Sequence, residues 1–376
     1  MRSLLLFVCL ILSQWLFAQD YYLFVGTYTS GKSKGIYVYR FNSQTGEAQW
    51  VSNTDSSNNP AFLAVSPNGK FLYAINEAGS PQSGHVSAYA FDAANGNLRL
   101  INQQPSGGLG PCFVTIDKTG KWVLAGNYMS GSLAALPVNK DGSLAPYTQM
   151  IQQEGSSVNK NRQEGPHVHS TFITPDQHYV LTPNLGTDKV MIYAFHKEDQ
   201  QPLKPAAQPF VRSIPGSGPR HLDFHPNRKY VYLIEEMSGT VSVFAYHEGR
   251  LKKRQTIATH PADFKGQPGS ADIHVSPDGK FLYASNRGEE NNIAIFSIDP
   301  VSGLLTAKGY QVLPGKWPRN FTIDPEGNFL LVANQQTNNI VIYKRDKETG
   351  MLEAMPQQLE VPSPVCLKLL RIESHQ

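Results

Sequence analysis

The stretch that decides the fold runs from residue 271 to residue 298 and reads ADIHVSPDGKFLYASNRGEENNIAIFSI. It holds three short apolar runs, at 273–275, 281–285 and 293–298, rich in the β-branched and aromatic residues that favour strands. Between the first two, Ser276-Pro277-Asp278-Gly279 supplies the fixed φ of proline and the positive φ of glycine that a tight turn needs. The passage therefore predicts an antiparallel pair of strands followed by a third strand.

The same passage recurs along the chain. Turns of the Ser276–Gly279 kind can be aligned at positions 67, 118, 175, 226, 277 and 325, which are 51, 57, 51, 51 and 48 residues apart. A repeat of roughly 40 to 50 residues that holds four short strands is typical of a β-propeller blade, a small sheet that buries its faces only by stacking on its neighbours. The spacing therefore predicts one repeat protein and not a string of separate domains.

The two ends of the chain complement each other. Residues 21–41 match the later strands of a blade but lack its first strand, whereas residues 364–369 match a first strand with nothing after it. Pairing the N- and C-terminal strands would close the ring and leave no sheet edge open. We therefore predict an all-β fold, a seven-bladed β-propeller with four antiparallel strands per blade, over residues 20–370, with residues 371–376 as a C-terminal tail.

Residues 1–19 have the order of a secretory signal. Arg2 precedes an apolar run from residue 4 to residue 12, and the small residue Ala18 stands near the end. The run is too short to span a bilayer. We expect a signal peptide over 1–19, a mature protein that is periplasmic or secreted, and no membrane association in the mature form; the alternative is a buried first strand.

Composition restricts the partners. The chain has 33 basic and 30 acidic residues without a charged run, which argues against a nucleic-acid partner. Beyond the leader, Cys112 and Cys366 fall on matching strands of different blades and are expected to be buried thiols. The chain lacks a nucleophile elbow, a Walker loop and a dinucleotide fingerprint, so we expect no cofactor, a small-molecule substrate and a monomer.

Candidate functional residues emerge from comparing the copies at one mouth of the channel. The blades have similar residues at the positions that pack against neighbouring blades. A single ligand that lies off the axis would be contacted by different residue types from each blade. Positions at the mouth where the residue type varies between the copies therefore indicate a binding site. These positions lie six residues before and ten residues after the aligned turn. With their neighbours, they give the candidate set His167, His169, Arg220, His221, Glu236, Arg287 and Arg319. A ring of solvated or mutually paired charges around a water-filled channel is the alternative.

Two further features concern the same mouth. The longest departure from the period, residues 145–166, is polar and is predicted to be a loop that ends there. His167 and His169, two residues apart, would point to one side of a strand and could chelate a metal, with either facing the axis. Because no cysteine or carboxylate motif accompanies them, no metal is assigned.

Four motifs resemble the signatures of the seven-bladed lactonase family, which includes bacterial 6-phosphogluconolactonase and the fungal carboxymuconate-cyclising enzyme. They are Gly26 to Thr29, Gly165 to Ser170, Gly218 to His221 and Ser276 to Gly288, and the resemblance covers essentially the whole mature chain. It implies a lactone-handling site built from the positions that match His169 or His167, Arg220, Glu236 and Arg287.

The hypothesis that follows is hydrolysis of a sugar lactone by direct attack of water. Arg220 would polarise the ester carbonyl, and either His169 or Glu236 would take the proton from water. Arg287, with Arg319, would hold a phosphate or carboxylate of the substrate, and His167 and His221 would also contact it. The alternatives are a lactonising cycloisomerase of the carboxymuconate type and a propeller that binds a ligand without turnover. The leader fits an exported sugar lactonase better than an enzyme for intracellular 6-phosphogluconolactone.

Overall fold

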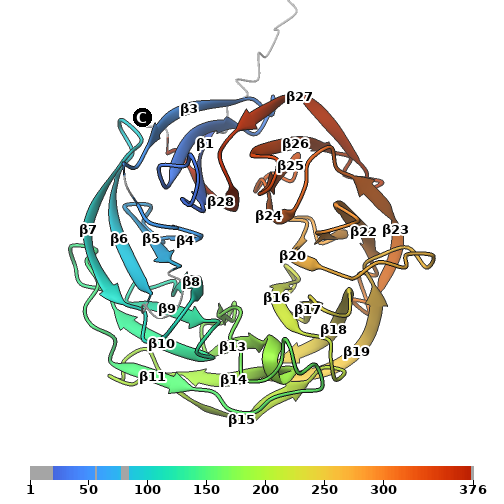
Figure 1. Ribbon diagram of the computed structural model, residues 1–376, viewed down its shortest axis with the longest axis horizontal. Coiled ribbons are helices and arrows are strands. Elements are labelled where there is room, and N and C mark those ends of the chain that lie inside the picture. The colour runs from blue at the N-terminus through green and yellow to red at the C-terminus, as the bar shows by residue number, and fades with distance from the viewer. Residues whose placement is uncertain (1–19, 56, 78–83, 374–376) are drawn as a thin grey trace, which may run out of the picture.

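Seven four-stranded antiparallel sheets surround a central axis in the computed structural model (Figure 1). The structure describes residues 20–55, 57–77 and 84–373. The leader expected over residues 1–19 and the last three residues of the chain lie outside this part. The arrangement confirms the seven-bladed β-propeller predicted from the repeat.

The first blade combines the two ends of the chain. From the axis outward it consists of β28 (Pro364–Arg371), β1 (Asp20–Thr27), β2 (Tyr37–Asn42) and β3 (Ala48–Asn53). Within the closing pair, Leu23 lies opposite Leu369 and Gly26 opposite Cys366. The C-terminal strand therefore supplies the innermost strand that the N-terminal repeat lacks, which confirms the expected closure.

The other six blades follow in chain order, each from its innermost to its outermost strand. The second and third consist of β4 (Phe62–Val65), β5 (Phe71–Asn76), β6 (His85–Asp92) and β7 (Asn97–Pro105), then β8 (Pro111–Ile116), β9 (Trp122–Asn127), β10 (Ser132–Pro137) and β11 (Gln149–Gln152). The fourth and fifth consist of β12 (Phe172–Ile173), β13 (Tyr179–Asn184), β14 (Lys189–Phe195) and β15 (Leu203–Arg212), then β16 (Pro219–Phe224), β17 (Tyr230–Glu235), β18 (Thr240–His247) and β19 (Arg250–Ala258). The sixth and seventh consist of β20 (Ser270–Val275), β21 (Phe281–Asn286), β22 (Asn292–Ile298) and β23 (Leu305–Val312), then β24 (Pro318–Ile323), β25 (Phe329–Asn334), β26 (Asn339–Arg345) and β27 (Leu352–Glu360).

Helix is almost absent from the described residues. A single 3-10 turn, η1 (Leu185–Thr187), follows β13. In the described ranges there is accordingly no helix with the length and apolarity needed to cross a membrane. The fold is carried by the sheets.

The blades pack against one another through apolar faces and through the outer hairpins. The middle strands are almost fully buried, as in β25, where every residue is buried. Gly142 and Gly350, both at positive φ, close the hairpins that follow β10 and β26. A Cβ atom at either would collide with an aromatic ring of the preceding blade, Phe71 or Phe281, so these hairpins need glycine for close approach as well as for φ.

Asparagine at the end of the second strand links that strand to the loop entering the blade. The Nδ2 atom of Asn76 donates to the carbonyl of Asn58 at 2.7 Å, and that of Asn286 donates to the carbonyl of Thr259 at 2.6 Å. These amides tie the end of the second strand to the loop that enters the same blade, which fixes the loops at the mouth of the channel.

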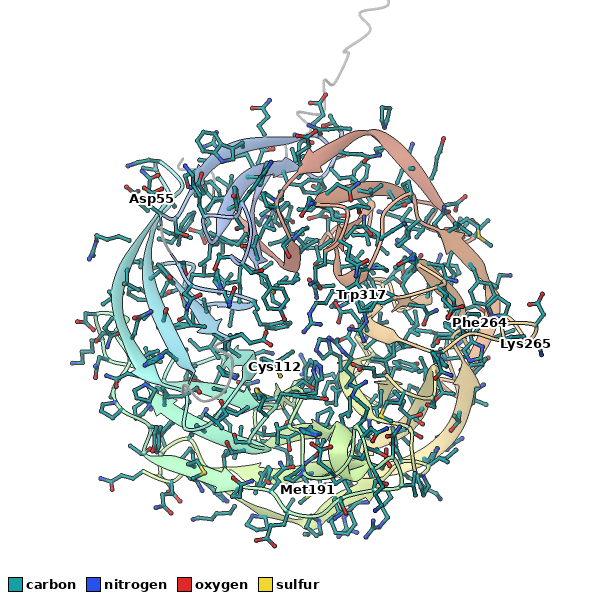
Figure 2. The ribbon with its side chains drawn as sticks, in the orientation of Figure 1. Asp55, Cys112, Met191, Phe264, Lys265 and Trp317 are labelled. Carbon is teal, nitrogen blue, oxygen red and sulfur yellow. The ribbon has the colours of Figure 1, made fainter. Side chains whose placement is uncertain are left out.

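The segment 145–166 also differs in part from expectation, because β11, the outer strand of the third blade, lies within it. The connecting loop runs from residue 153 to residue 171. The two thiols agree with prediction: Cys112 in β8 and Cys366 in β28 are buried and free. Figure 2 places Cys112 and Trp317 beside the central opening and Met191 toward the outer edge.

Candidate active site

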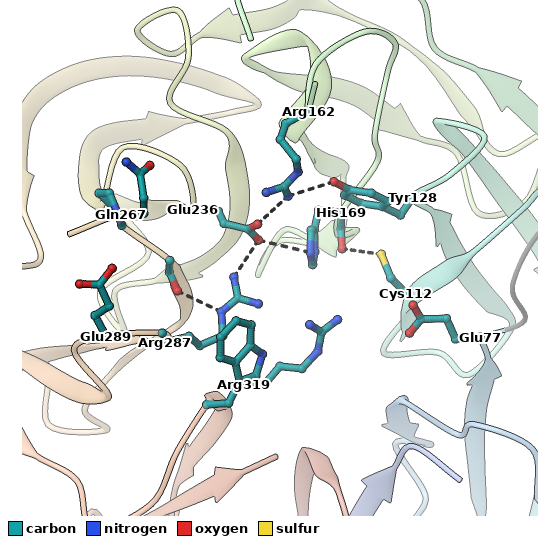
Figure 3. A pocket seen from close by; sticks show the side chains of 14 residues that line it. Glu77, Cys112, Tyr128, Arg162, His169, Glu236, Gln267, Arg287, Glu289 and Arg319 are labelled. Carbon is teal, nitrogen blue, oxygen red and sulfur yellow. Dashed lines mark hydrogen bonds and ion pairs between the residues drawn. The ribbon is translucent and has the colours of Figure 1, made fainter. Parts of the chain in front are cut away.

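A cavity of about 620 Å³ opens at one mouth of the central channel (Figure 3). Its wall contains His169, Glu236, Arg287 and Arg319, which come from four different blades or the loops between them. The ring therefore brings together four of the seven residues that the repeat comparison selected. The wall also contains Glu77, Tyr128, Arg162, Glu289 and Trp317.

Local backbone geometry aims these side chains at the mouth. Pairing between β16 and β17 shifts register between Pro219 and His221, so Arg220 is an extra residue in a β-bulge. The same irregularity occurs at the matching positions of β8 and β24, which carry Cys112 and Arg319. A bulge re-aims the side chain of the additional residue, which is why these positions differ in direction from the strand around them.

The residues after the second strands are held by a shared backbone contact. The N–H of Glu236 donates to the carbonyl of Gly218 at 2.7 Å, and the N–H of Arg287 donates to that of Gly269 at 3.1 Å. Each bond joins the end of a second strand to the glycine-containing loop before the inner strand of the same blade. Both side chains consequently start from a fixed point beside the cavity.

Glu236 is the centre of the charge network. Its Oε2 atom accepts from Nε of Arg220 at 3.0 Å and lies 3.1 Å from Nη2 of Arg287. Its Oε1 atom accepts from Nη2 of Arg162 at 2.8 Å. Burial by itself raises the pKa of Glu236, but the charges of Arg287 and Arg220 hold that pKa well below its ordinary value. Glu236 is therefore a buried carboxylate that stays ionised at neutral pH.

His169 is the neutral group beside this carboxylate. Its Nε2 atom lies 4.0 Å from Oε2 of Glu236, and its side chain is 7% exposed. Among the described residues, Nδ1 has no hydrogen-bond partner. Burial, reinforced by the charge of Arg220, lowers the pKa of His169 well below its ordinary value. The imidazole is thus uncharged at neutral pH and able to accept a proton.

His167 does not share this position. Its ring stacks on Tyr128 with centroids 4.4 Å apart, its Nδ1 atom is 2.9 Å from the carbonyl oxygen of Tyr128, and its Nε2 atom is 3.3 Å from Glu164. The wall of the cavity contains His169 and not His167. Within the described ranges, no three histidine, cysteine or acidic side chains are grouped so as to hold a metal ion.

Arg220 and His221 lie beneath the cavity and not in its wall. Arg220 is 1% exposed, and its Nη1 atom donates to the carbonyl of Ala271 at 2.6 Å. The same Nη1 atom is 3.3 Å from the His221 ring, whose Nδ1 atom is 2.8 Å from Oδ1 of Asp272. Burial, together with Arg220, lowers the pKa of His221 to about 3, so this ring is neutral. These residues form the floor that supports Glu236.

The two remaining arginines reach the cavity from the opposite side to Arg162. Arg287 donates from Nε to the carbonyl of Gly269 at 3.0 Å and lies over the ring of Trp317, 5.5 Å from its centroid. Arg319 lies 5.5 Å from the centroid of Tyr28. Figure 3 shows the Arg319 guanidinium within the cavity, facing the group formed by Glu236 and His169.

Arg162 was not selected from the sequence, although it stands in the polar segment assigned to the mouth. The loop that carries it is anchored at Asp188, which accepts from Oγ of Ser157 at 2.5 Å and from the N–H of Gly216 at 2.6 Å. Nη2 of Arg162 also lies 3.3 Å from the hydroxyl of Tyr128. A charge in the longest insertion at the mouth is the signal that could have identified it.

Comparison with known proteins gives consistent results. The family model described as Lactonase, 7-bladed beta-propeller, matches residues 22–369. The chain is 42% identical over 351 residues to the 6-phosphogluconolactonase of Formosa agariphila, which covers 92% of this chain and 99% of the relative. It is 36% identical over 349 residues to that of Bacillus subtilis, with 92% and 97% covered. The structure of the periplasmic gluconolactonase of Pseudomonas aeruginosa is 37% identical, with a TM-score of 0.89 and coverage of 94% and 100%.

Proposed function

Because the chain belongs to the seven-bladed β-propeller lactonase family, we propose that it hydrolyses a sugar lactone in the cavity at the mouth of its channel. The observation that carries the proposal is the pairing of Glu236, a carboxylate that is ionised at neutral pH, with a neutral buried imidazole, His169. The reaction needs a base for water and cations for the oxyanion, and the cavity contains both.

His169 is the general base in this proposal. The neutral imidazole has a lone pair that can accept a proton, whereas protonation of a carboxylate held by three arginines would break its ion pairs. The separation of 4.0 Å between Nε2 of His169 and Oε2 of Glu236 leaves room for a water molecule to bond to both. As His169 takes the proton, Glu236 stabilises the imidazolium that forms. The imidazolium then gives this proton to the ring oxygen as the acyl C–O bond breaks, which yields the hydroxy acid.

The oxyanion is assigned to Arg287 and Arg319, whose side chains line the cavity. Preorganised cations in a partly dry site stabilise the charge that develops on the carbonyl oxygen. The role expected for Arg220 changes, because its Nε and Nη1 atoms bind Glu236 and Ala271 under the cavity floor. We assign Arg220 to positioning Glu236, and His221 to supporting Arg220.

The alternatives considered from the sequence are not favoured. The relatives at 42% and 36% identity are named lactonases, and each aligns over nearly its whole length. Neither a cycloisomerase nor a non-catalytic propeller stands among them. These names describe the relatives, and they support hydrolysis of a lactone by this chain.

The test is acid release from glucono-δ-lactone at neutral pH, corrected for spontaneous opening. We expect His169→Asn and Glu236→Gln each to lower kcat by at least about 100-fold, the range typical of a general acid–base group. His247→Asn is the matched control, since that side chain is 84% exposed at the end of β18. Turnover at the unmodified rate in both cavity variants would contradict the assignment.

We also propose that residues 1–19 are a signal peptide and that the mature protein is exported and monomeric. The tail expected over residues 371–376 begins too early, because Arg371 is the last residue of β28 and pairs with Tyr21. The sequence of the leader supports export, and the Pseudomonas relative is named as periplasmic. Cell fractionation of the full chain and of a chain that starts at residue 20 tests this. Equal distribution of the two between periplasm and cytoplasm would argue against a leader.

A further inference from the structure

We propose that the cavity selects an uncharged sugar lactone over its phosphate ester and that Glu77 and Glu289 set this preference. The proposal rests on the lactonase function given above and deepens it by naming the class of substrate. Neither carboxylate belongs to the group that handles the proton or the oxyanion.

The first argument is the balance of charge. The wall contains three arginines, Arg162, Arg287 and Arg319, and three carboxylates, Glu77, Glu236 and Glu289. Beneath the floor, Arg220 adds one positive charge and Asp272 one negative charge. The formal charges of the wall and the floor therefore balance. They leave no surplus positive charge for a phosphate, which carries about −1.5 to −2 at pH 7.

The second argument is that two of the three wall arginines are already engaged. Arg162 and Arg287 both bond to the carboxylate of Glu236, at 2.8 and 3.1 Å. In the described structure Arg319 does not bind Glu236; it packs on the ring of Tyr28, whose hydroxyl donates to Oε2 of Glu77 at 2.7 Å. Tight phosphate sites use several guanidinium groups that are free to bond in pairs to the phosphate oxygens. A phosphate here would find one such arginine, near the Glu77 carboxylate, and would have to draw a second away from Glu236.

The third argument is the position of the two carboxylates. Figure 3 shows Glu289 and Glu77 on opposite sides of the cavity. Among the described residues, neither takes part in an ion pair with a basic side chain within 4.0 Å, as Glu236 does. The sequence between Glu77 and Gly84 contains no ionisable side chain that could neutralise it. A dianion that enters the cavity would therefore meet negative charge on two sides.

The adjoining surface extends this effect. Glu289 also borders a neighbouring depression of about 690 Å³, which contains Asp263 and Glu290 against one basic residue, Lys265. The approach from this side is acidic as well. Electrostatic repulsion acts on the encounter with a charged substrate and is weakened by salt.

The same residues suit a neutral sugar. Carboxylate oxygens of Glu77 and Glu289 are acceptors for sugar hydroxyl groups, which donate. Trp317, half-buried in the wall, offers an aromatic surface on which the apolar face of a sugar ring can rest. An uncharged polyhydroxy lactone therefore finds both hydrogen-bond acceptors and an apolar contact.

The experiment compares kcat/KM for glucono-δ-lactone and for its 6-phosphate on the full-length purified protein. We expect the uncharged lactone to be preferred at least about tenfold, because one unfavourable unit charge a few ångströms away is an effect of this size. Glu289→Gln keeps the shape of the side chain and should raise the ratio of kcat/KM for the phosphate ester to kcat/KM for the uncharged lactone about tenfold. Glu77→Gln should act in the same direction.

Two controls separate the outcomes. Glu353→Gln removes an equal charge from the exposed outer strand β27 and should leave kcat/KM unchanged for both substrates. Raising the salt concentration should increase turnover of the phosphate ester alone. Preference for the ester in the unmodified protein, or no change in Glu289→Gln, would overturn this inference and leave the lactonase function standing. Failure to open either lactone would remove both.

Discussion

The Nε2 atom of His169 lies 4.0 Å from the Oε2 atom of Glu236, and the two side chains differ in charge at neutral pH although both are buried. Burial acts on both in the same sense, by disfavouring the charged form. At Glu236 the positive charges of the arginines outweigh the effect of burial, so the pKa stays well below its ordinary value. At His169 the arginine charges act in the same direction as burial and lower the pKa further. One pair of neighbours thus provides a proton acceptor and a fixed negative charge.

This relationship predicts the pH dependence of lactone hydrolysis. Because the pKa of His169 is well below 6.5, the base is already deprotonated at pH 6, and kcat/KM should be level from about pH 6 to pH 8. Activity should decline only in more acidic solution, as His169 gains a proton. Rates corrected for spontaneous opening between pH 4 and pH 8 check this. An acidic limb centred near the ordinary histidine value would show that His169 is not the base, or that its ring is more solvated.

A second prediction concerns the stability of the charge network. Glu236→Gln leaves three arginines without their shared anion, and removing one partner of a buried pair costs about 3 kcal/mol or more. In the unmodified protein the depressed pKa means that this stabilisation is present above pH 4.5 and is lost as the pH falls through the lower value of the folded state. Denaturant unfolding of the variant and the unmodified protein at pH 7, and of the unmodified protein at a series of pH values below 4.5, measures it. Equal stability of the variant and the unmodified protein at pH 7 would contradict the prediction.

Much of this fold could be predicted because every blade buries its two faces in the same way and therefore has a similar sequence pattern. The turn at Ser276–Gly279 recurs with nearly constant spacing, and the unmatched strands at the chain ends require closure. The position of the mouth followed from the same alignment, which put His169, Glu236, Arg287 and Arg319 into one set. These four side chains do meet in one cavity.

The rest depended on contacts that the repeat does not contain. Arg162 lies in a loop outside the repeat, and its approach to Glu236 follows from the anchoring of that loop at Asp188. Arg220 occupies the same aligned position as Arg319, yet its side chain lies beneath the cavity. Its Nη1 atom donates to the carbonyl of Ala271 and contacts the ring of His221, and these contacts hold it there. An alignment of the repeats predicts in which blade, and at which end of a strand, a residue lies. It does not predict the direction of the side chain, because that depends on contacts with neighbouring residues.

The third prediction tests the floor beneath the site. Asp272 accepts from His221, from the N–H of Phe321 at 3.2 Å and from the amide of Asn320, so Asp272→Asn removes an acceptor from a buried network. We expect kcat to fall about tenfold with little change in KM, since Arg220 loses the ring that supports it and Glu236 shifts. The kcat and KM values separate this positioning role from loss of substrate contact.

Asp223→Asn is the control for this change. Its carboxylate is 3.8 Å from Nδ1 of His274 and accepts from the N–H of Val275 at 2.8 Å. It reaches Asp272 through His274, whose Nε2 atom is 3.1 Å from Oδ2 of Asp272, and in the described structure it does not contact the His221 ring. We therefore expect kcat to fall less than in Asp272→Asn. If both variants lose activity equally, the effect is one of general stability and the floor has no special role.

The last prediction separates the two arginines that hold Glu236 from opposite sides. Arg162 has a side chain that is 46% exposed, whereas that of Arg220 is 2% exposed. Arg162→Gln should therefore change the free energy of unfolding by less than about 1 kcal/mol, as for exposed ion pairs, but Arg220→Gln by about 3 kcal/mol. Both should lower kcat, because each removes a bond that fixes Glu236 beside His169. Unfolding curves and kcat measured on the same preparations distinguish the roles: an Arg162 variant with an intact fold and unchanged kcat would show that the outer bond does not position the carboxylate.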